Sequence, residues 1–179
     1  MEQGAARAVK PRTLLDGSAR AADRAWMAAA YAAARAAMRH GEVPVGAIVV
    51  RDGVRIARAA NRVIRDQDAT AHAELLALRR AARTVGDRRL GDCVLYVTLE
   101  PCAMCAGAIV LARVGRVVFG AWDEKAGMAG SVDDLLRHPA LNHRPDVTGG
   151  VCADECAALL RDFFERRRGN SVDTPPVGG

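Results

Sequence analysis

Two short segments of the chain contain side chains that can bind a metal ion. One contains His72 and Glu74, and the other contains Cys102 and Cys105, three positions apart. Residues i and i+3 of a helix share a face, so both sulfurs can approach one point. The amides at a helix N-terminus carry partial positive charge and stabilise thiolates, the form in which cysteine binds zinc. The two segments therefore predict a zinc site at two helix starts.

The number of ligands predicts which kind of zinc site this is. His72, Cys102 and Cys105 are three protein ligands, one fewer than a closed structural site has, so a fourth position remains for water. Zinc lowers the pKa of bound water to ~7 and so generates hydroxide at neutral pH. Glu74, two residues after His72, is too near it to be a fourth ligand without strain. We assign Glu74 as the general acid/base that moves a proton to a departing amine.

Each piece of this pattern has a plainer interpretation when it is taken alone. A Cys-x-x-Cys pair also occurs in redox proteins and structural zinc sites, and a single histidine is more often a surface residue. The joint pattern His-x-Glu with Pro-Cys-x-x-Cys is more specific and is similar to the signature of zinc-dependent deaminases. A further pair, Cys152 and Cys156, has i, i+4 spacing, and Cys93 opens an apolar run. We expect these three residues to be buried free thiols.

The elements that must position these residues alternate along the chain. Apolar runs predict strands at 45–50, 54–59, 93–98 and 116–120, and the Asp-Gly turn predicts that the first two form a hairpin. Helices are predicted at 23–40, 71–84, 103–112, 132–137 and 153–168. This alternation predicts an α/β domain of three layers, α/β/α, in which helices cover both faces of a mixed central sheet.

Length and composition predict one domain between two irregular ends. The 179 residues suffice for a single core. Residues 1–22 lack periodicity and are predicted to be a flexible extension, 23–168 to be the zinc-dependent domain, and 169–179 to be a disordered tail. The net charge of +5 favours a polyanionic partner, although a solvated basic surface explains the charge equally well.

Targeting signals and cysteine usage predict a cytoplasmic protein. The N-terminus has no apolar core of signal-peptide type, and the Ala-rich stretch 26–38 is too short and too weakly apolar to span a bilayer. The five cysteines are odd in number and are not spaced like a disulfide framework, which favours reduced thiols. We therefore expect no membrane association.

From about residue 25 to 168 the chain resembles bacterial tRNA-specific adenosine deaminases, which belong to the cytidine/deoxycytidylate deaminase superfamily. The runs that carry the resemblance are 43–47, 70–74, 95–102, 104–108, 115–120, 142–143 and 154–160. The Asn-His pair at 142–143 and the Asp-Phe-Phe ending at Phe164, with the arginines after it, are more particular to the tRNA branch.

The resemblance implies a fold, an activity and an assembly. The fold is cytidine-deaminase-like, and the assembly is a homodimer. The activity is hydrolytic conversion of adenosine to inosine at the wobble position of a tRNA anticodon, with release of ammonia. His72, Cys102 and Cys105 match the ligands of the Zn²⁺ cofactor, and Glu74 matches the proton shuttle.

The resemblance also implies contacts to the anticodon stem-loop. Asn61 matches the residue that hydrogen-bonds the flipped base, Asp123 a contact to the nucleotide backbone or ribose, and Phe164 a C-terminal contact to the loop. The sequence departs from the family at Ala69, where proline is usual, and carries Trp122 at a variable position. Both departures concern the RNA contacts and leave the metal ligands intact.

Two other functions remain as alternatives. A free base or nucleoside deaminase of guanine or cytosine type uses the same zinc core, and the basic C-terminal helix with Arg161 and the arginines at 166–168 disfavours it. A non-catalytic, zinc-stabilised RNA-binding module is disfavoured by Glu74, because a structural site has no use for an unligated carboxylate.

Overall fold

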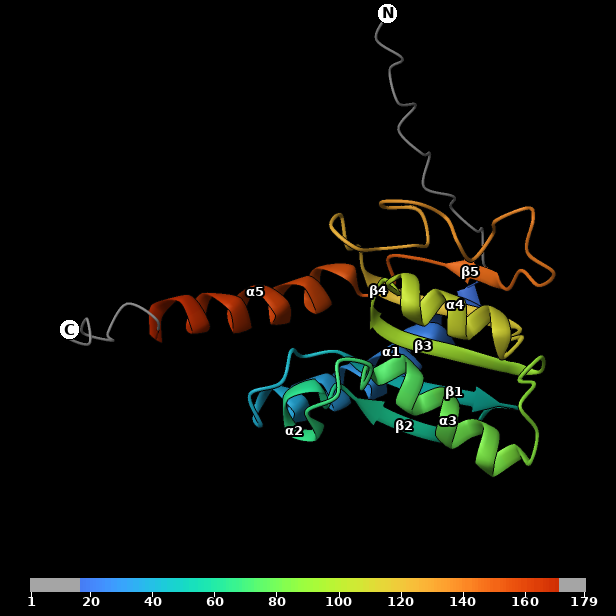
Figure 1. Ribbon diagram of the computed structural model, residues 1–179, viewed down its shortest axis with the longest axis horizontal. Coiled ribbons are helices and arrows are strands. Elements are labelled where there is room, and N and C mark those ends of the chain that lie inside the picture. Colours follow the sequence, from blue (N-terminus) through green and yellow to red (C-terminus); the bar gives the residue numbers. More distant parts are fainter. Residues whose placement is uncertain (1–16, 171–179) are drawn as a thin grey trace, which may run out of the picture.

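A mixed five-stranded sheet with helices on both faces forms the protein (Figure 1). The computed structural model describes residues 17–170. The elements in chain order are α1 Gly17–Met38, β1 Gly46–Arg51, β2 Val54–Ala60, α2 Val63–Asp66, α3 Ala73–Val85, β3 Cys93–Leu99, α4 Ala103–Leu111, β4 Arg116–Ala121, β5 Asp146–Thr148 and α5 Ala153–Asn170. The strand order is β2-β1-β3-β4-β5, with β1 antiparallel to β2 and β3 and with β3, β4 and β5 parallel. The predicted hairpin and the predicted mixed sheet are confirmed.

Alternation along the central strands creates one apolar cluster on each face of the sheet. Successive strand residues point to opposite faces, so neighbours in sequence join different clusters. Leu95 and Val117 pack in the cluster that contains the apolar sides of α3 and α4. Tyr96 and Val118 pack in the cluster that contains residues of α1 and α5. The predicted three-layer α/β/α arrangement follows from this alternation and is confirmed (Figure 1).

A buried ion pair ties α1 to the strands. The carboxylate of Asp23 is 1% exposed and accepts hydrogen bonds from both terminal nitrogens of Arg116, at 2.9 and 2.7 Å, and from the hydroxyl of Tyr96 at 3.0 Å. Arg116 also donates to Thr148 of β5 at 3.1 Å. These bonds offset the desolvation of the two charges and fix the register of the helix against β3, β4 and β5.

The ends of the chain differ in part from the prediction. The first helix begins at Gly17, so residues 17–22 are helical and do not belong to a flexible extension. The last helix ends at Asn170, so residues 169–170 are helical and do not belong to a disordered tail. Residues 1–16 and 171–179, which contain the rest of the predicted extension and of the predicted tail, lie outside the described residues. No helix within 17–170 has the combination of length and hydropathy needed to cross a membrane.

The helix predicted at 132–137 is wrong. The amide of Val132 donates to the carbonyl of Gly127, and the amide of Leu135 donates to Met128, so these donors are not used in i to i−4 bonds. An isolated antiparallel bridge joins Ala129 to Asp134. The segment therefore folds back on the loop before it. The short elements α2 and β5 were not predicted, because three or four residues carry too little periodicity to recognise.

Candidate active site

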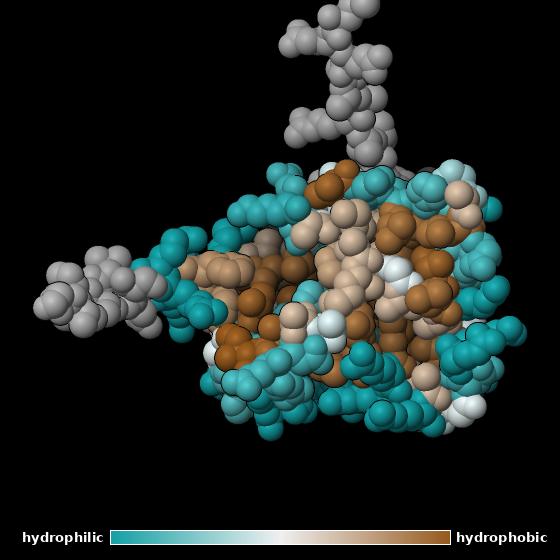
Figure 2. Space-filling view, viewed as in Figure 1, coloured by the Kyte–Doolittle hydropathy of each residue, from teal (hydrophilic) through white to brown (hydrophobic). Residues whose placement is uncertain are grey.

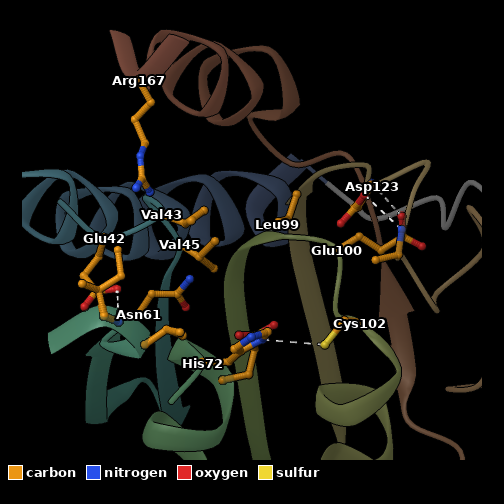
Figure 3. A pocket seen from close by; sticks show the side chains of 14 residues that line it. Glu42, Val43, Val45, Asn61, His72, Leu99, Glu100, Cys102, Asp123 and Arg167 are labelled. Carbon is orange, nitrogen blue, oxygen red and sulfur yellow. Dashed lines mark hydrogen bonds between the residues drawn. The ribbon is translucent and has the colours of Figure 1, made fainter. Parts of the chain in front are cut away.

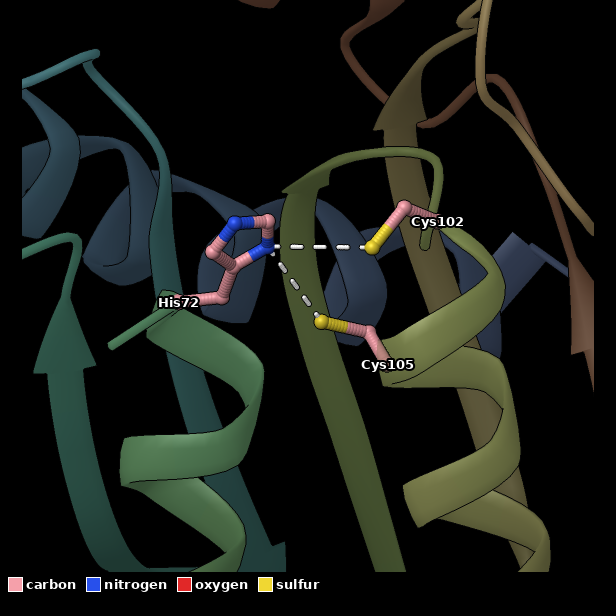
Figure 4. A group of neighbouring side chains, drawn as sticks. All are labelled: His72, Cys102 and Cys105. Carbon is pink, nitrogen blue, oxygen red and sulfur yellow. Dashed lines mark hydrogen bonds between the residues drawn. The ribbon is translucent and has the colours of Figure 1, made fainter. Parts of the chain in front are cut away.

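Topology brings the starts of α3 and α4 together, beside the C-terminal ends of β2 and β3. Strands β2 and β3 both run antiparallel to β1, so their C-terminal ends lie together. His72 is the N-cap residue of α3, and Cys102 is the N-cap residue of α4, each with extended backbone. Neither side chain caps its own helix, so the imidazole and the thiol are free to meet in the space between the helices (Figure 4). Cys105 lies one turn into α4 on the same side.

The three predicted ligands form one compact group. The Nδ1 atom of His72 lies 3.7 Å from the sulfur of Cys102 and 3.6 Å from the sulfur of Cys105 (Figure 4). One ligand atom from each of the three residues lies within 4.8 Å of the other two, a spacing at which they can hold one metal ion. The structure therefore brings together the set that the sequence predicted.

Negative charge concentrates on one sulfur of this group. Hydrogen bonds from Cys105 and from His72 lower the pKa of Cys102 to about 4. The same contact with Cys102 raises the pKa of His72. The pKa of Cys105 is raised by its hydrogen bond to Cys102 and by burial. The thiolate of Cys102 is the form in which cysteine binds zinc, so this sulfur is suited to a metal cation.

The carboxyl group of Glu74 is buried beside these ligands. It is 3% exposed, and its Oε2 atom has no hydrogen-bond partner among the described residues. Burial raises the pKa of Glu74 to about 7. A buried carboxyl oxygen without a partner is costly to the fold, and a perturbed acid in a cleft is a feature of catalytic sites.

A pocket of about 390 Å³ opens above the group (Figure 3). Its walls include Asn61 and Asp123, two of the three residues predicted to contact the substrate. The Oδ1 atom of Asn61 accepts a hydrogen bond from the amide of Ala73 at 2.9 Å, which leaves its Nδ2 group available. Arg167 reaches toward the pocket from α5 (Figure 3).

Phe164 and Trp122 do not line this pocket. Phe164 is 43% exposed on α5 and packs edge-on against Phe163, with ring centroids 5.3 Å apart. Trp122 packs edge-on against Phe119 at 4.7 Å, and a Cβ atom on Gly149 would lie only 2.8 Å from its ring. The tryptophan is therefore part of the edge of the core.

Three further cysteines lie away from the ligand group. Cys93, Cys152 and Cys156 form no disulfide. Cys93 and Cys156 are buried, as predicted, whereas Cys152 is half-buried.

Two buried carboxylates in the pocket wall were given no role from the sequence. Glu42 accepts hydrogen bonds from the amides of Ile64, at 3.2 Å, and Arg65, at 2.7 Å, and so holds α2 at the mouth of the pocket. Its position before the apolar run of β1 gave no signal of this contact, because α2 itself was not predicted.

Glu100 anchors the opposite wall. Its carboxylate accepts hydrogen bonds from the amides of Asp123, Ala129 and Ser131, at 3.0, 2.9 and 3.0 Å, and from the Ser131 hydroxyl. A Cβ atom on Gly127 would lie 2.3 Å from the Glu100 carboxyl carbon, so only glycine fits there. The sequence did offer one signal of this anchoring role, because Glu100 is a charged residue directly between a buried strand and the Pro-Cys-x-x-Cys segment.

Replacement of Glu100 by glutamine should loosen this wall. In the glutamine variant an NH₂ group replaces one carboxylate oxygen and faces the N–H and O–H donors of the wall. About two charge-assisted hydrogen bonds are therefore lost, each worth about 1.5–3 kcal/mol. We expect Glu100→Gln to lower the free energy of unfolding in urea by about 3 kcal/mol. Glu124→Gln, at an exposed position in the same loop, is the control and should change it by less than about 0.5 kcal/mol. Equal unfolding midpoints for the two variants would contradict the anchoring role.

Comparison with known proteins identifies the family. The family model of MafB19-like deaminases matches residues 21–168. A tRNA-specific adenosine deaminase of Bacillus subtilis is 46% identical over 146 residues, covering 82% of this chain and 91% of the relative. A solved structure from a study of A-to-I editing by tRNA:A34 deaminases matches with a TM-score of 0.74 and 44% identity, covering 76% of this chain and 99% of that chain. The guanine deaminase of Nitrosomonas europaea matches with a TM-score of 0.70 and 27% identity, covering 87% and 88%. The chain matches the MafB19-like deaminase model and belongs to the tRNA-specific adenosine deaminase family.

Proposed function

We propose that this protein is a zinc-dependent hydrolase that converts adenosine to inosine at the wobble position of a tRNA anticodon and releases ammonia. The observation that carries the proposal is the metal-ligand group of His72, Cys102 and Cys105 beside the buried carboxyl group of Glu74. The family membership supports the substrate, because the relatives at 44–46% identity are named for tRNA adenosine deamination.

The donor set fits zinc. Tetrahedral zinc has bonds of about 2.0 Å to imidazole nitrogen and about 2.3 Å to thiolate sulfur, so nitrogen and sulfur ligands stand about 3.5 Å apart. The distances of 3.7 and 3.6 Å from His72 Nδ1 to the two sulfurs agree with this value. A zinc ion held by these three residues would have a position open for water, and it would lower the pKa of that water toward ~7.

Glu74 supplies the proton transfers. Its carboxylate takes a proton from the water that attacks the carbon bearing the amine and places it on the adjacent ring nitrogen. It then carries the remaining hydroxyl proton to the amine, which leaves as ammonia. One water is consumed, and the amine is replaced by a carbonyl oxygen. Burial of Glu74 favours this exchange, because a carboxyl group whose pKa is about 7 accepts and releases protons near neutral pH.

Three residues orient the substrate in this proposal. Asn61 donates a hydrogen bond from Nδ2 to the flipped base, since its Oδ1 atom is already held by Ala73. Asp123, at the pocket wall held by Glu100, contacts the ribose or backbone. Phe164 offers an exposed aromatic face on α5 on which a base of the anticodon loop stacks.

Removal of the Glu74 carboxylate should greatly slow turnover without loss of the metal. Glutamine has the same shape but does not carry the proton, so Glu74→Gln should lower the single-turnover rate by about 10²–10⁴-fold. Zinc content should stay at the wild-type level, because Glu74 is not a ligand. Glu155→Gln, at an exposed position on α5, is the matched control. A near-normal rate for Glu74→Gln would remove this residue from the mechanism.

The substrate class is tested by direct competition among nucleic acids. An adenosine in a hairpin loop is already unpaired, so moving it into the pocket costs less than extracting a paired base. At equal concentration we expect inosine to form in an anticodon-sized hairpin, with little product from an RNA duplex, free adenosine or free guanine. Mass spectrometry of the products gives the answer. Turnover of a free nucleoside or base as efficient as that of the hairpin would instead support a free base or nucleoside deaminase.

We also propose that the chain forms a homodimer through the outer faces of α3 and α4. A groove of about 500 Å³ between these helices is lined by Leu75, Leu78, Ala82, Ala108 and Leu111 among others, and Leu111 is 80% exposed. Figure 2 shows hydrophobic side chains gathered over this face. Contiguous apolar patches on a surface mark sites of association. A partner on this face would lie beside the two helices that carry the metal ligands.

A charge placed in this groove should separate the subunits. Leu111→Arg would bury an unpaired cation at the contact, so we expect a monomer mass in sedimentation equilibrium, against a dimer mass for the unaltered chain. Val54→Arg, at another exposed apolar residue, is the control and should remain dimeric. A dimer mass for Leu111→Arg would exclude this face as the interface.

A further inference from the structure

A second groove lies between α1 and the C-terminal half of α5. It has a volume of about 570 Å³, and its lining includes Tyr31 and Arg35 from α1, Arg39 from the turn after α1, and Asp162, Arg166 and Arg167 from α5. We call it the α1–α5 groove. It contains none of the proposed metal ligands and none of the residues assigned to the base.

The charge of the groove is strongly unbalanced. Its one carboxylate, Asp162, pairs with Arg166 at 2.7 Å. Arg35 and Arg39 are exposed and take part in none of the ion pairs formed within residues 17–170. Arg39 directly follows the last residue of α1, so the like charges of Arg35 and Arg39 repel each other at the end of this helix when nothing is bound. An anionic ligand in the groove would remove that repulsion.

The groove shares a lining residue with the proposed active-site pocket. Arg167 lines both the α1–α5 groove and the pocket above His72. Figure 3 shows its side chain extending from α5 toward Val43 and Glu42, at the pocket wall. A polymer that places one base in the pocket therefore has a cationic path past Arg167 and along α1.

We propose that the α1–α5 groove binds successive phosphates of the RNA strand that flanks the edited adenosine. This inference rests on the proposed function. From Tyr31 to Met38, its last residue, α1 advances about 10 Å, which is long enough for more than one phosphate at about 3.4 Å or more per nucleotide. The ring of Tyr31 at the end of this path offers a surface on which an unpaired base stacks.

The test compares two double variants that remove the same charge. Arg35→Gln/Arg39→Gln removes two positive charges from the lining of the groove. Arg55→Gln/Arg83→Gln is the control, because both arginines are exposed and lie at the ends of β2 and α3 that are remote from the pocket. The dissociation constant of a labelled anticodon hairpin is measured by fluorescence anisotropy over a range of salt concentrations, together with KM and kcat.

For the groove variant we expect the dissociation constant and KM to rise about tenfold relative to the control, and kcat to change less than about twofold. The slope of log K against log salt should fall in magnitude by about 1.4, or ~0.7 for each lost contact to a single strand. Arg35→Lys/Arg39→Lys keeps the charge and should retain the slope.

Three results would overturn or redirect the account. Equal weakening of RNA binding in both double variants would mean that only net charge matters, and would overturn the proposal that the α1–α5 groove binds the RNA. An altered oligomeric mass with unchanged RNA binding would assign the groove to a protein contact instead. Failure of the unaltered chain to deaminate the hairpin would overturn the proposed function, while the anisotropy data would still decide whether the groove binds RNA.

Discussion

The site depends on one constraint, which is that two helix N-termini meet beside the C-terminal ends of β2 and β3. Because β2 and β3 are both antiparallel to β1, the chain leaves both strands at the same edge and starts α3 and α4 there. His72 and Cys102 are separated by 30 positions, yet His72 Nδ1 and the Cys102 sulfur are 3.7 Å apart. The alternating apolar strands and the buried Asp23–Arg116 pair hold the sheet to its helices, and so keep these two ends in register.

Three buried glutamates in the pocket illustrate how partners decide the role of a carboxylate. Glu42 accepts hydrogen bonds from two backbone amides, and Glu100 accepts them from three amides and a hydroxyl, so each anchors a segment of the wall. Glu74 is equally buried, but its Oε2 atom has no partner among the described residues. A satisfied carboxylate stabilises structure, whereas an unsatisfied one beside metal ligands is available for chemistry.

The parts of the fold that follow from local patterns were predictable, and those that depend on distant contacts were not. The hairpin, the main strands and the helices that carry His72, Cys102 and Cys105 follow from periodicity and helix-start chemistry. The helix expected at 132–137 fails because Val132 and Leu135 donate to the preceding loop, and Glu100, 31 positions before Ser131, holds that loop through the Ser131 amide. Sequence spacing likewise gave no sign that Arg167 lies at the pocket, since this depends on how α5 packs against α1.

The central claim, that three side chains hold one zinc ion in an open site, is tested most directly by metal content. Native mass spectrometry of the purified chain should give one zinc per chain, and Cys102→Ala should have lost it. Cys93→Ala removes a buried thiol from the same strand-to-helix unit, outside the ligand group, and should keep the metal. Full zinc occupancy in Cys102→Ala would contradict the assignment of these ligands.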